Sequence, residues 1–171
     1  RLFNGSPHKW NWEYKGKEVK YVPYNNYGID STELSYEDVL GKVSANPDLV
    51  RWELHRVHKI VGTLKDEYRH WYSKRVMWLD EDSWHALLGD NYDNRGELWR
   101  TNWTGHLWFP TCDCLHARVA AYHDFQARAY VLDRLVNEVP ESKIMKMNHA
   151  HHEGGEDQFY SPANLRMLGR R

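Results

Sequence analysis

The stretch ELHRVHKIVGTLKDEYRHWYSKRVMWLDEDSWHALLGDNYDNRGELWR, which runs from Glu53 to Arg100, decides the fold of this chain. Together with the residues just before it, its first part alternates in hydrophobicity. One set of alternate residues is mostly apolar: Val50, Trp52, Leu54, Arg56, His58, Ile60, Gly62 and Leu64. The set between them, from Arg51 to Thr63, is mostly polar. A period of two is typical of a half-buried antiparallel strand, so we expect a strand over 50–64.

Three further strands are expected after this one, over 69–79, 85–92 and 97–103. Short polar turns separate them, namely KDEY, DEDS and DNRG. Aspartate and serine side chains in such turns bond to their own backbone, and Gly96 can take a positive φ angle at no steric cost. Four strands joined by short turns form a meander.

The amino-terminal part predicts irregular structure over 1–30, apart from a short strand, GKEVKYVP, that ends at Pro23. Ser35 and Asp38 have the spacing of a helix capping box, so a short helix is expected at about 36–40.

Two more strands are expected after the meander, over 118–125 and 127–135, although the alanines there also permit a helix. The terminal segment SPANLRMLG predicts a short helix, because Ser161 suits the N-cap, Pro162 the first position and Gly169 the end. The predicted fold class is therefore α+β and mainly antiparallel β, as a meander sheet with a few short helices.

The composition limits the function. The chain has 171 residues, which suits one domain, and its formal net charge is −1 because 23 lysines and arginines nearly balance 24 acidic residues. No basic field would collect phosphates, so nucleic acid is not an expected partner. Nine tryptophans and eleven tyrosines fill a core or line a surface for sugars or lipids.

The residues that suggest metal or thiol chemistry lie late in the chain. HAHHEGGED supplies the candidate metal ligands His149, His151 and His152, and the alternative is a solvated loop. Cys112 and Cys114 are separated by one residue, which strains a mutual disulfide. We expect two free thiols or a bond to a missing segment, and no cofactor.

Catalytic sequence patterns are not found, neither for a nucleophile, a metalloprotease nor a phosphate loop. Acidic residues such as Asp80 and Asp90 could suggest glycoside cleavage. They lie in or beside predicted turns, where aspartate serves the backbone. We therefore expect a protein that is not an enzyme.

Several segments together resemble the carboxy-terminal part of a bacterial family, domain of unknown function 1329. These segments are YVPYNNY, NPDLVRWELHRV, the stretch quoted first and YSPANLRMLGRR. Within the core of the match, 46–100, the motifs ELHRV, DEDSW and YDNRGELWR are distinctive. TCDCLHARVA and MNHAHHEGG depart from the family pattern, so the resemblance assigns no role to their cysteines or histidines.

The resemblance implies the fold of lipoprotein-localisation carriers such as LolA, a curved half-barrel sheet with helices on its concave side. It also implies a periplasmic or outer-membrane-associated location, an apolar ligand, and an association with export pumps of the resistance-nodulation-division type. Residues 1–171 would then be a single domain or the carboxy-terminal portion of a longer LolA-like domain. No catalytic residue is established for the family, so none is carried over.

The expected function is non-enzymatic binding or relay of a lipid or another hydrophobic small molecule. The predicted apolar lining is Trp52, Leu54, Ile60, Trp71, Met77 and Leu79. Two alternatives stay open: a structural or assembly subunit of a larger envelope complex, in which an exposed sheet edge recruits a partner or the missing amino-terminal segment, and a carbohydrate-binding module, which needs coplanar exposed rings.

Overall fold

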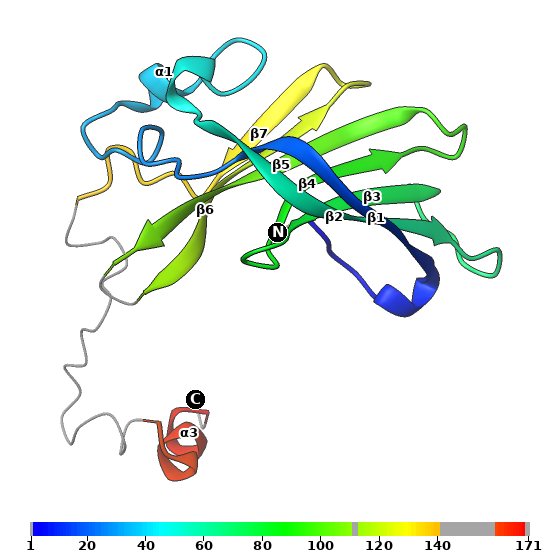
Figure 1. The fold of residues 1–171 in the computed structure, drawn as a ribbon. Helices are drawn as coiled ribbons and strands as arrows, with labels where there is room; N and C mark the ends of the chain where they lie inside the picture. Colours follow the sequence, from blue (N-terminus) through cyan, green and yellow to red (C-terminus); the bar gives the residue numbers. More distant parts are fainter. Residues whose placement is uncertain (1, 111–112, 141–159, 170–171) are drawn as a thin grey trace.

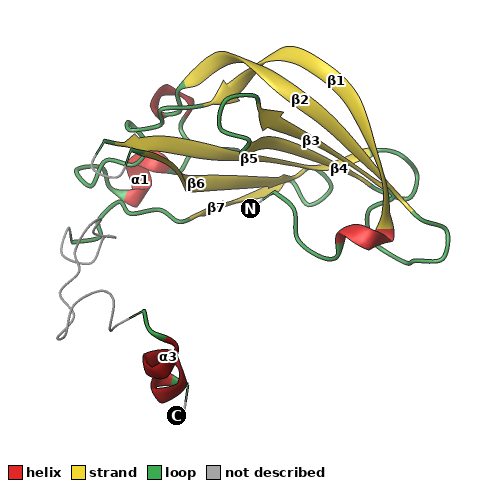
Figure 2. Ribbon diagram, turned by 60° about the horizontal axis from the view of Figure 1, so that its bottom comes forward, coloured by secondary structure: helices red, strands yellow, loops and turns green. Residues whose placement is uncertain are grey.

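A computed structural model describes residues 2–110, 113–140 and 160–169 of the chain. Within these residues seven strands form one antiparallel sheet in chain order, β1 to β7, as Figure 1 shows. The strands are β1 (Trp10–Pro23), β2 (Trp52–Leu64), β3 (Lys74–Asp80), β4 (Ala86–Tyr92), β5 (Leu98–Phe109), β6 (Cys114–Asp124) and β7 (Ala129–Asp133). The predicted meander and the α+β, mainly antiparallel class are confirmed. The sheet is open and strongly curved, and β1 and β2 arch over the other strands (Figure 2).

Short helices occupy the connections and the carboxy-terminal end. They are the 3-10 turns η1 (Pro7–Lys9) and η2 (Pro47–Leu49) and the helices α1 (Tyr36–Val39) and α3 (Pro162–Leu168). The capping box of Ser35 and Asp38 at α1 is present, and Ser161 caps α3 as the sequence predicts. No residue of α3 is buried.

Several strand boundaries differ from the prediction: β5 continues to Phe109, beyond its expected end at 103, and β6 begins at Cys114 rather than at 118. β1 begins at Trp10, although irregular structure was expected there; a bulge between Tyr14 and Lys17, with Gly16 at a φ of 91°, lets the long strand stay paired. Conversely, 69–73 is not a strand, because the Nδ1 of His70 accepts the backbone N–H of Tyr72 at 2.9 Å. Such a local bond competes with strand pairing.

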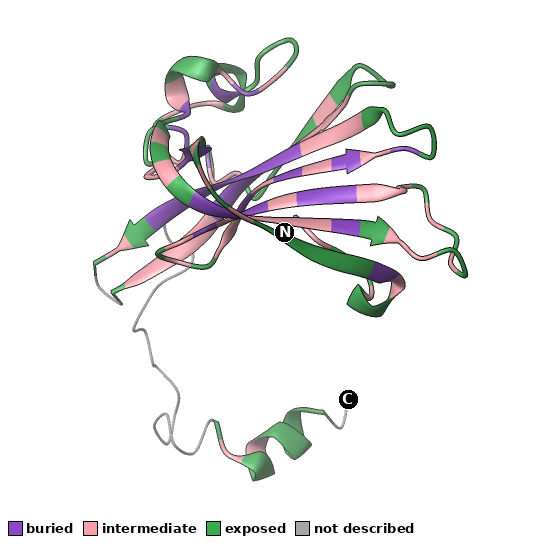
Figure 3. Cartoon of the chain, turned by 45° about the vertical axis from the view of Figure 1, so that its right-hand side comes forward, coloured by how far each residue is buried: buried purple, intermediate pink, exposed green. Residues whose placement is uncertain are grey.

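Most of the apolar core lies on one face of the sheet, which we call the core face. One cluster joins Val22, Val57, Val76, Trp78 and Leu87 across β1 to β4. A second cluster brings Ile29, Val39, Ala45 and Val50 against Trp103, Val119 and Ala121. Residues 24–50, which include α1, therefore cover this face at one end of the sheet, and Figure 3 colours buried residues both in this segment and along the strands.

On β2 the core face carries the mostly polar set of alternate residues. Val57 of that set is fully buried, whereas Leu54 of the mostly apolar set is exposed on the other face. Trp52 of the same set is partly exposed, with its ring 6.1 Å from that of Trp103 in the core. Tertiary packing decides which set is buried, because Val57 meets Val22 and Trp78 in the core cluster.

The connection after β1 ties the two sides of the curved sheet together. The backbone N–H of Asn26 donates to the carbonyl of His106 on β5 at 3.0 Å, and its side-chain oxygen accepts the N–H of Arg51. Gly105 makes this approach possible, because a Cβ there would lie 2.8 Å from a methyl carbon of Val119 and 3.3 Å from Asn26.

Cys114, at the start of β6, is disulfide-bonded. The expectation of two free thiols is therefore wrong for this residue. Cys112 lies outside the described residues, as do His149, His151 and His152.

Candidate functional site

A pocket of about 1140 Å³ opens on the face of the sheet opposite the core face. We call this side the pocket face. Two adjacent cross-strand rows form its floor. In one row the register aligns Arg75, Asn91, Arg100, Asp124 and Ala129. The next row aligns Met77, Gly89, Asn102, Tyr122 and Val131.

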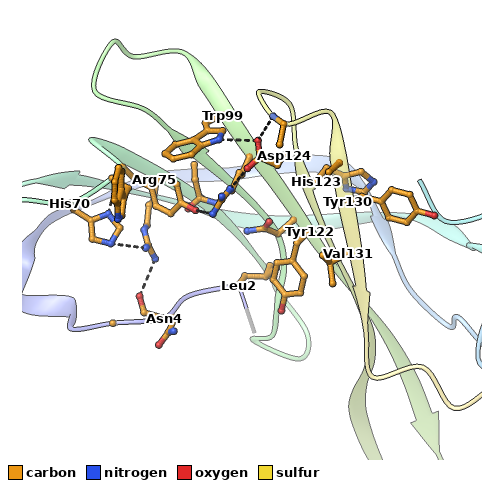
Figure 4. Close-up of a pocket in the computed structure, with 18 residues that line it drawn as sticks. Leu2, Asn4, His70, Arg75, Trp99, Tyr122, His123, Asp124, Tyr130 and Val131 are labelled. Atoms are coloured by element: carbon orange, nitrogen blue, oxygen red, sulfur yellow. Dashed lines mark hydrogen bonds and ion pairs between the residues drawn. The ribbon is translucent and has the colours of Figure 1, made fainter. Parts of the chain in front are cut away.

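The amino-terminal segment forms one side of the pocket (Figure 4). Leu2 is buried there and packs on Gly89, where an added Cβ would lie 3.5 Å from the Leu2 Cβ. Glycine at this position therefore leaves room for the segment to lie close to the sheet.

Aromatic rings form much of the remaining wall. Trp99 meets Trp71 and Tyr72 edge to face, with ring centres 6.5 Å and 5.5 Å apart. On the β7 side His123 stacks on Tyr130 at 5.8 Å at the margin of the pocket, but both residues alternate toward the core face, where the hydroxyl of Tyr130 donates to the carbonyl of Gly41. Edge-to-face and stacked rings present large apolar surfaces with fixed geometry, which suits an apolar ligand.

One end of the pocket is held by a hydrogen-bonded group. Arg100 donates to Asp124 at 2.7 Å and to the hydroxyl of Tyr72 at 2.9 Å. The indole N–H of Trp99 reaches the same carboxylate at 3.0 Å. Burial alone would raise the pKa of Asp124, but hydrogen bonds from Ala127, Arg100 and Trp99 outweigh it and lower the pKa. The carboxylate therefore stays charged and fully engaged.

Arg75 is the other charged group on the floor, and it is buried. Its guanidinium carbon lies 4.8 Å from the ring centre of Trp10 and 5.0 Å from those of Phe3 and Tyr72. Burial lowers the pKa of Arg75. Burial, then the charges of Arg75 and Lys9, also lower the pKa of His70 beside it, so the imidazole favours its neutral form.

Of the six residues predicted to line an apolar site, Trp71 lines this pocket, and the other five are not among its lining residues. Ile60 pairs with Met77, which extends the second row toward β1, and Leu79 pairs with His58. Trp71 precedes β3 and lines the pocket, with three quarters of its side chain exposed (76%).

Trp52 and Leu54 lie at the far end of β2, opposite Pro23 and Tyr21, away from the pocket. The part of all six residues in ligand binding stays a prediction. Sequence reasoning missed Arg75, Asn102, Tyr122 and Leu2, since only the register of distant strands brings them together.

A second polar group lies on the core face at the start of the turn after β3. The fully buried Asp80 is 2.9 Å from the Nδ1 of His55, and it accepts the hydroxyl of Ser83 at 2.7 Å and its N–H at 3.0 Å. Burial raises the pKa of Asp80, but the bonds from Ser83 and His55 outweigh it, so the net pKa is lowered. Burial, then the charge of Asp80, raise the pKa of Tyr24 to about 12.

Ligand atoms of His55, Asp80 and Asp82 lie within 4.8 Å of one another, a spacing that could hold a metal ion. A cation there would compete with His55 and Ser83 for the oxygens of Asp80. A smaller pocket of about 330 Å³ lies beside the group, lined in part by Tyr24, Asp82 and His85. The bonds already made to Asp80 indicate that this group stabilises the turn.

Among the described residues, no helix has the length and apolar character needed to cross a membrane.

Comparison with known proteins identifies one matching family model, described as a protein of unknown function (DUF1329), over residues 1–166. An uncharacterized protein of Pseudomonas aeruginosa, PA3922, is 33% identical over 175 aligned residues, which cover 98% of this chain. The chain spans only 36% of that relative's length.

Two solved structures are similar over 72% of this chain and 38% of their own. One is named as an outer membrane lipoprotein-sorting protein domain from Vibrio parahaemolyticus, with 15% identity and a TM-score of 0.43. The other is a DUF1329 family protein from Desulfovibrio piger, with 13% identity and a TM-score of 0.45.

Proposed function

This chain belongs to the DUF1329 family of proteins of unknown function, and from that premise we propose that it binds or relays a lipid-like apolar ligand in the cell envelope without acting as an enzyme. The proposal concerns the part of the molecule described above, since the chain spans 36% of its curated relative. A periplasmic or outer-membrane-associated location and a link to an export pump belong to the proposal.

The observation that carries the proposal is the pocket on the pocket face. Its volume of about 1140 Å³ lies just above the range of about 300–1000 Å³ that is usual for small-molecule sites. Most of the surface that its wall exposes is apolar, although eight of the eighteen lining residues are asparagine, histidine, arginine or aspartate. Concave apolar surfaces of this kind bind apolar ligands.

Apolar area supplies the affinity in such a site. Burying about 300 Å² of ligand hydrocarbon contributes about 7.5 kcal/mol at 25 cal/mol per Å². The ordering of ligand and side chains on association offsets several kcal/mol of this. The expected affinity is therefore moderate, which suits a protein that must also release its ligand.

Binding is tested by displacement of a fluorescent lipophile from the purified chain, with native mass spectrometry to weigh any bound ligand. Val131→Glu puts a charge on the pocket floor and should abolish displacement. Val19→Glu is the matched control, because Val19 is as exposed as Val131 (63% and 61%) but lies on β1, outside the pocket. Equal binding by both variants, or no binding by the unmodified chain, would contradict the proposal.

An assembly role is the second candidate, and the edge strand β1 favours it. β1 is a long strand that pairs with β2 on one side and ends the sheet on the other. Val19 and Tyr21 are exposed there, and such edges accept added strands. Light scattering after size-exclusion chromatography tests this role, and a monomer at all concentrations would argue against it.

A carbohydrate-binding platform has less support. Sugar platforms need exposed rings that lie flat together, but Trp71 and Trp99 cross at 74°. Trp10 and Trp12 are tilted by 42°. These pairs present ring edges as well as ring faces. Such an arrangement fits the wall of a pocket better than a flat platform on which a sugar ring stacks.

A further inference from the structure

We propose that the pocket takes an amphiphile with an anionic head, a carboxylate or a phosphate, and that Arg75 binds the head. The inference rests on the proposed function, which it deepens by naming the chemistry of the ligand.

Arg75 is a buried cation whose charge the described residues leave unbalanced. Two arginines are buried among them, Arg75 and Arg118, which are 6% and 8% exposed. Arg118 donates to Asp30 at 3.1 Å. Arg75 has no carboxylate within 4.0 Å in the described part of the chain. A buried charge is costly unless it is paired.

The N–H groups of Arg75 also lack acceptors. A guanidinium carries five donors. One nitrogen reaches the carbonyl of Asn4 at 3.3 Å, and Nε is buried with no partner among the described residues. The three surrounding rings, those of Phe3, Trp10 and Tyr72, offset part of the cost through cation–π contact but accept few of the hydrogen bonds.

His70 does not supply the missing acceptor. Its Nε2 lies 3.4 Å from a terminal nitrogen of Arg75, while its Nδ1 accepts the N–H of Tyr72. A neutral imidazole has a single acceptor nitrogen. Because Nδ1 is that acceptor, Nε2 carries the proton and turns a donor toward Arg75. The pair therefore forms two donors at one place, a favourable setting for an anion.

The other charged residues that line the pocket do not balance the positive charge of Arg75. Of the lining residues, Arg75, Arg100 and Asp124 are charged. Asp124 is engaged by Arg100 and Trp99, so one positive charge remains when the histidines are neutral.

The layout of the pocket fits a head and a tail. Arg75 and His70 lie at the β3 side, and Tyr122 and Val131 lie toward β7, as Figure 4 shows. A head at Arg75 would send its tail over Tyr122 to Val131. An anionic oxygen would then accept from Arg75 and His70 through charge-assisted hydrogen bonds.

The test uses titration calorimetry on the full 171-residue chain, with ligands that share one tail but differ in the head group. The ligands, each below its micelle concentration, are dodecanoate, dodecyl phosphate, dodecanol and dodecyltrimethylammonium. We expect at least one of the two anions to bind about tenfold or more tightly than dodecanol, and the cation to bind most weakly. The tighter of the two anions identifies the head group. This comparison needs no variant.

Arg75→Gln should weaken binding of the anion by about tenfold or more, to the level of dodecanol, and should weaken dodecanol binding by a much smaller factor. Arg51→Gln, an exposed arginine outside the pocket, is the matched control and should change neither. Equal affinity of the unmodified chain for anion and alcohol would overturn the inference while leaving the proposed function intact. An equal loss of both ligands in Arg75→Gln would mean that Arg75 only holds the amino-terminal segment, and would also overturn it. Failure of every probe to bind would instead refute the proposed function.

Discussion

Leu54 and Val57 lie on the same strand and point to opposite faces of the sheet, with Leu54 59% exposed and Val57 fully buried. The strand thus turns its mostly polar set of residues toward the core. Val57 is buried because Val22, Trp78 and Leu87 meet it there. Substitutions of buried residues on the core face should therefore lower the free energy of unfolding more than substitutions of exposed residues on the opposite face.

Leu87→Ala should destabilise the protein by about 2–5 kcal/mol, because it removes a fully buried side chain from the core cluster. Leu54→Ala, the same substitution at an exposed position, should cost less than about 1 kcal/mol. Urea unfolding followed by tryptophan fluorescence measures both. A larger loss for Leu54→Ala would mean that the core lies on the opposite face.

Asp80→Ala should lower the free energy of unfolding by about 3 kcal/mol. It removes the acceptor for the N–H and hydroxyl of Ser83 and for the ring of His55, and buried donors without acceptors are costly. Asp82→Ala, at an exposed carboxylate in the same turn, is the control and should change stability little. If instead the two variants unfold at the same urea concentration, the bonds of Asp80 contribute nothing to stability.

Gly105→Ala should destabilise the protein by about 1–3 kcal/mol, since the new methyl would lie 2.8 Å from a carbon of Val119. Gly89→Ala is a fair comparison, because its nearest neighbour, Leu2, would be at an ordinary 3.5 Å. Thermal unfolding measures both midpoints. A tolerated Gly105→Ala would show that the connection at Asn26 is not held closely to β5.

His106 should make stability depend on pH. Burial, then the nearby His85, lower the pKa of His106 from 6.5 to about 4. Between these two values the unfolded state binds a proton that the folded state excludes. The stability is therefore fully present above pH 6.5 and is lost as the pH falls toward 4, by at most about 1.4 kcal/mol per pH unit.

The measurement is the free energy of unfolding across this window for the unmodified chain and for His106→Gln, whose amide does not titrate but can still donate to the carbonyl of Thr104. The difference between the two curves isolates His106 from the other histidines. Curves that stay parallel would show that His106 does not titrate differently on unfolding.

The local elements could be predicted from the sequence, because short-range chemistry determines them. Alternation of side chains predicted β2, the flanking polar turns predicted β4, and the spacing of Ser35 and Asp38 predicted the start of α1. The strand that was expected to begin at Arg69 begins only at Lys74, since no periodicity reveals the bond between His70 and Tyr72.

The site was harder to predict. Ile60 and Met77 pair across β2 and β3, but neither lines the pocket, so their part in ligand binding stays a prediction. Arg75 gave no signal, because an arginine in a strand of mixed residues is ordinary. Its distinction is that no carboxylate of the described residues pairs with it, which is a property of everything packed around it.

The sequence by itself determined that there are strands, where they turn and that their two faces differ, because period-two alternation and turn chemistry act between near neighbours. Only the tertiary structure decided which face is buried, which residues share a cross-strand row, and that Arg75 lies against three rings with no carboxylate partner in the described part of the chain. These depend on the pairing register of distant strands and on what covers each face, as residues 24–50 cover one and Leu2 the other. Burial is a relation between distant segments, so no single stretch of the chain contains it.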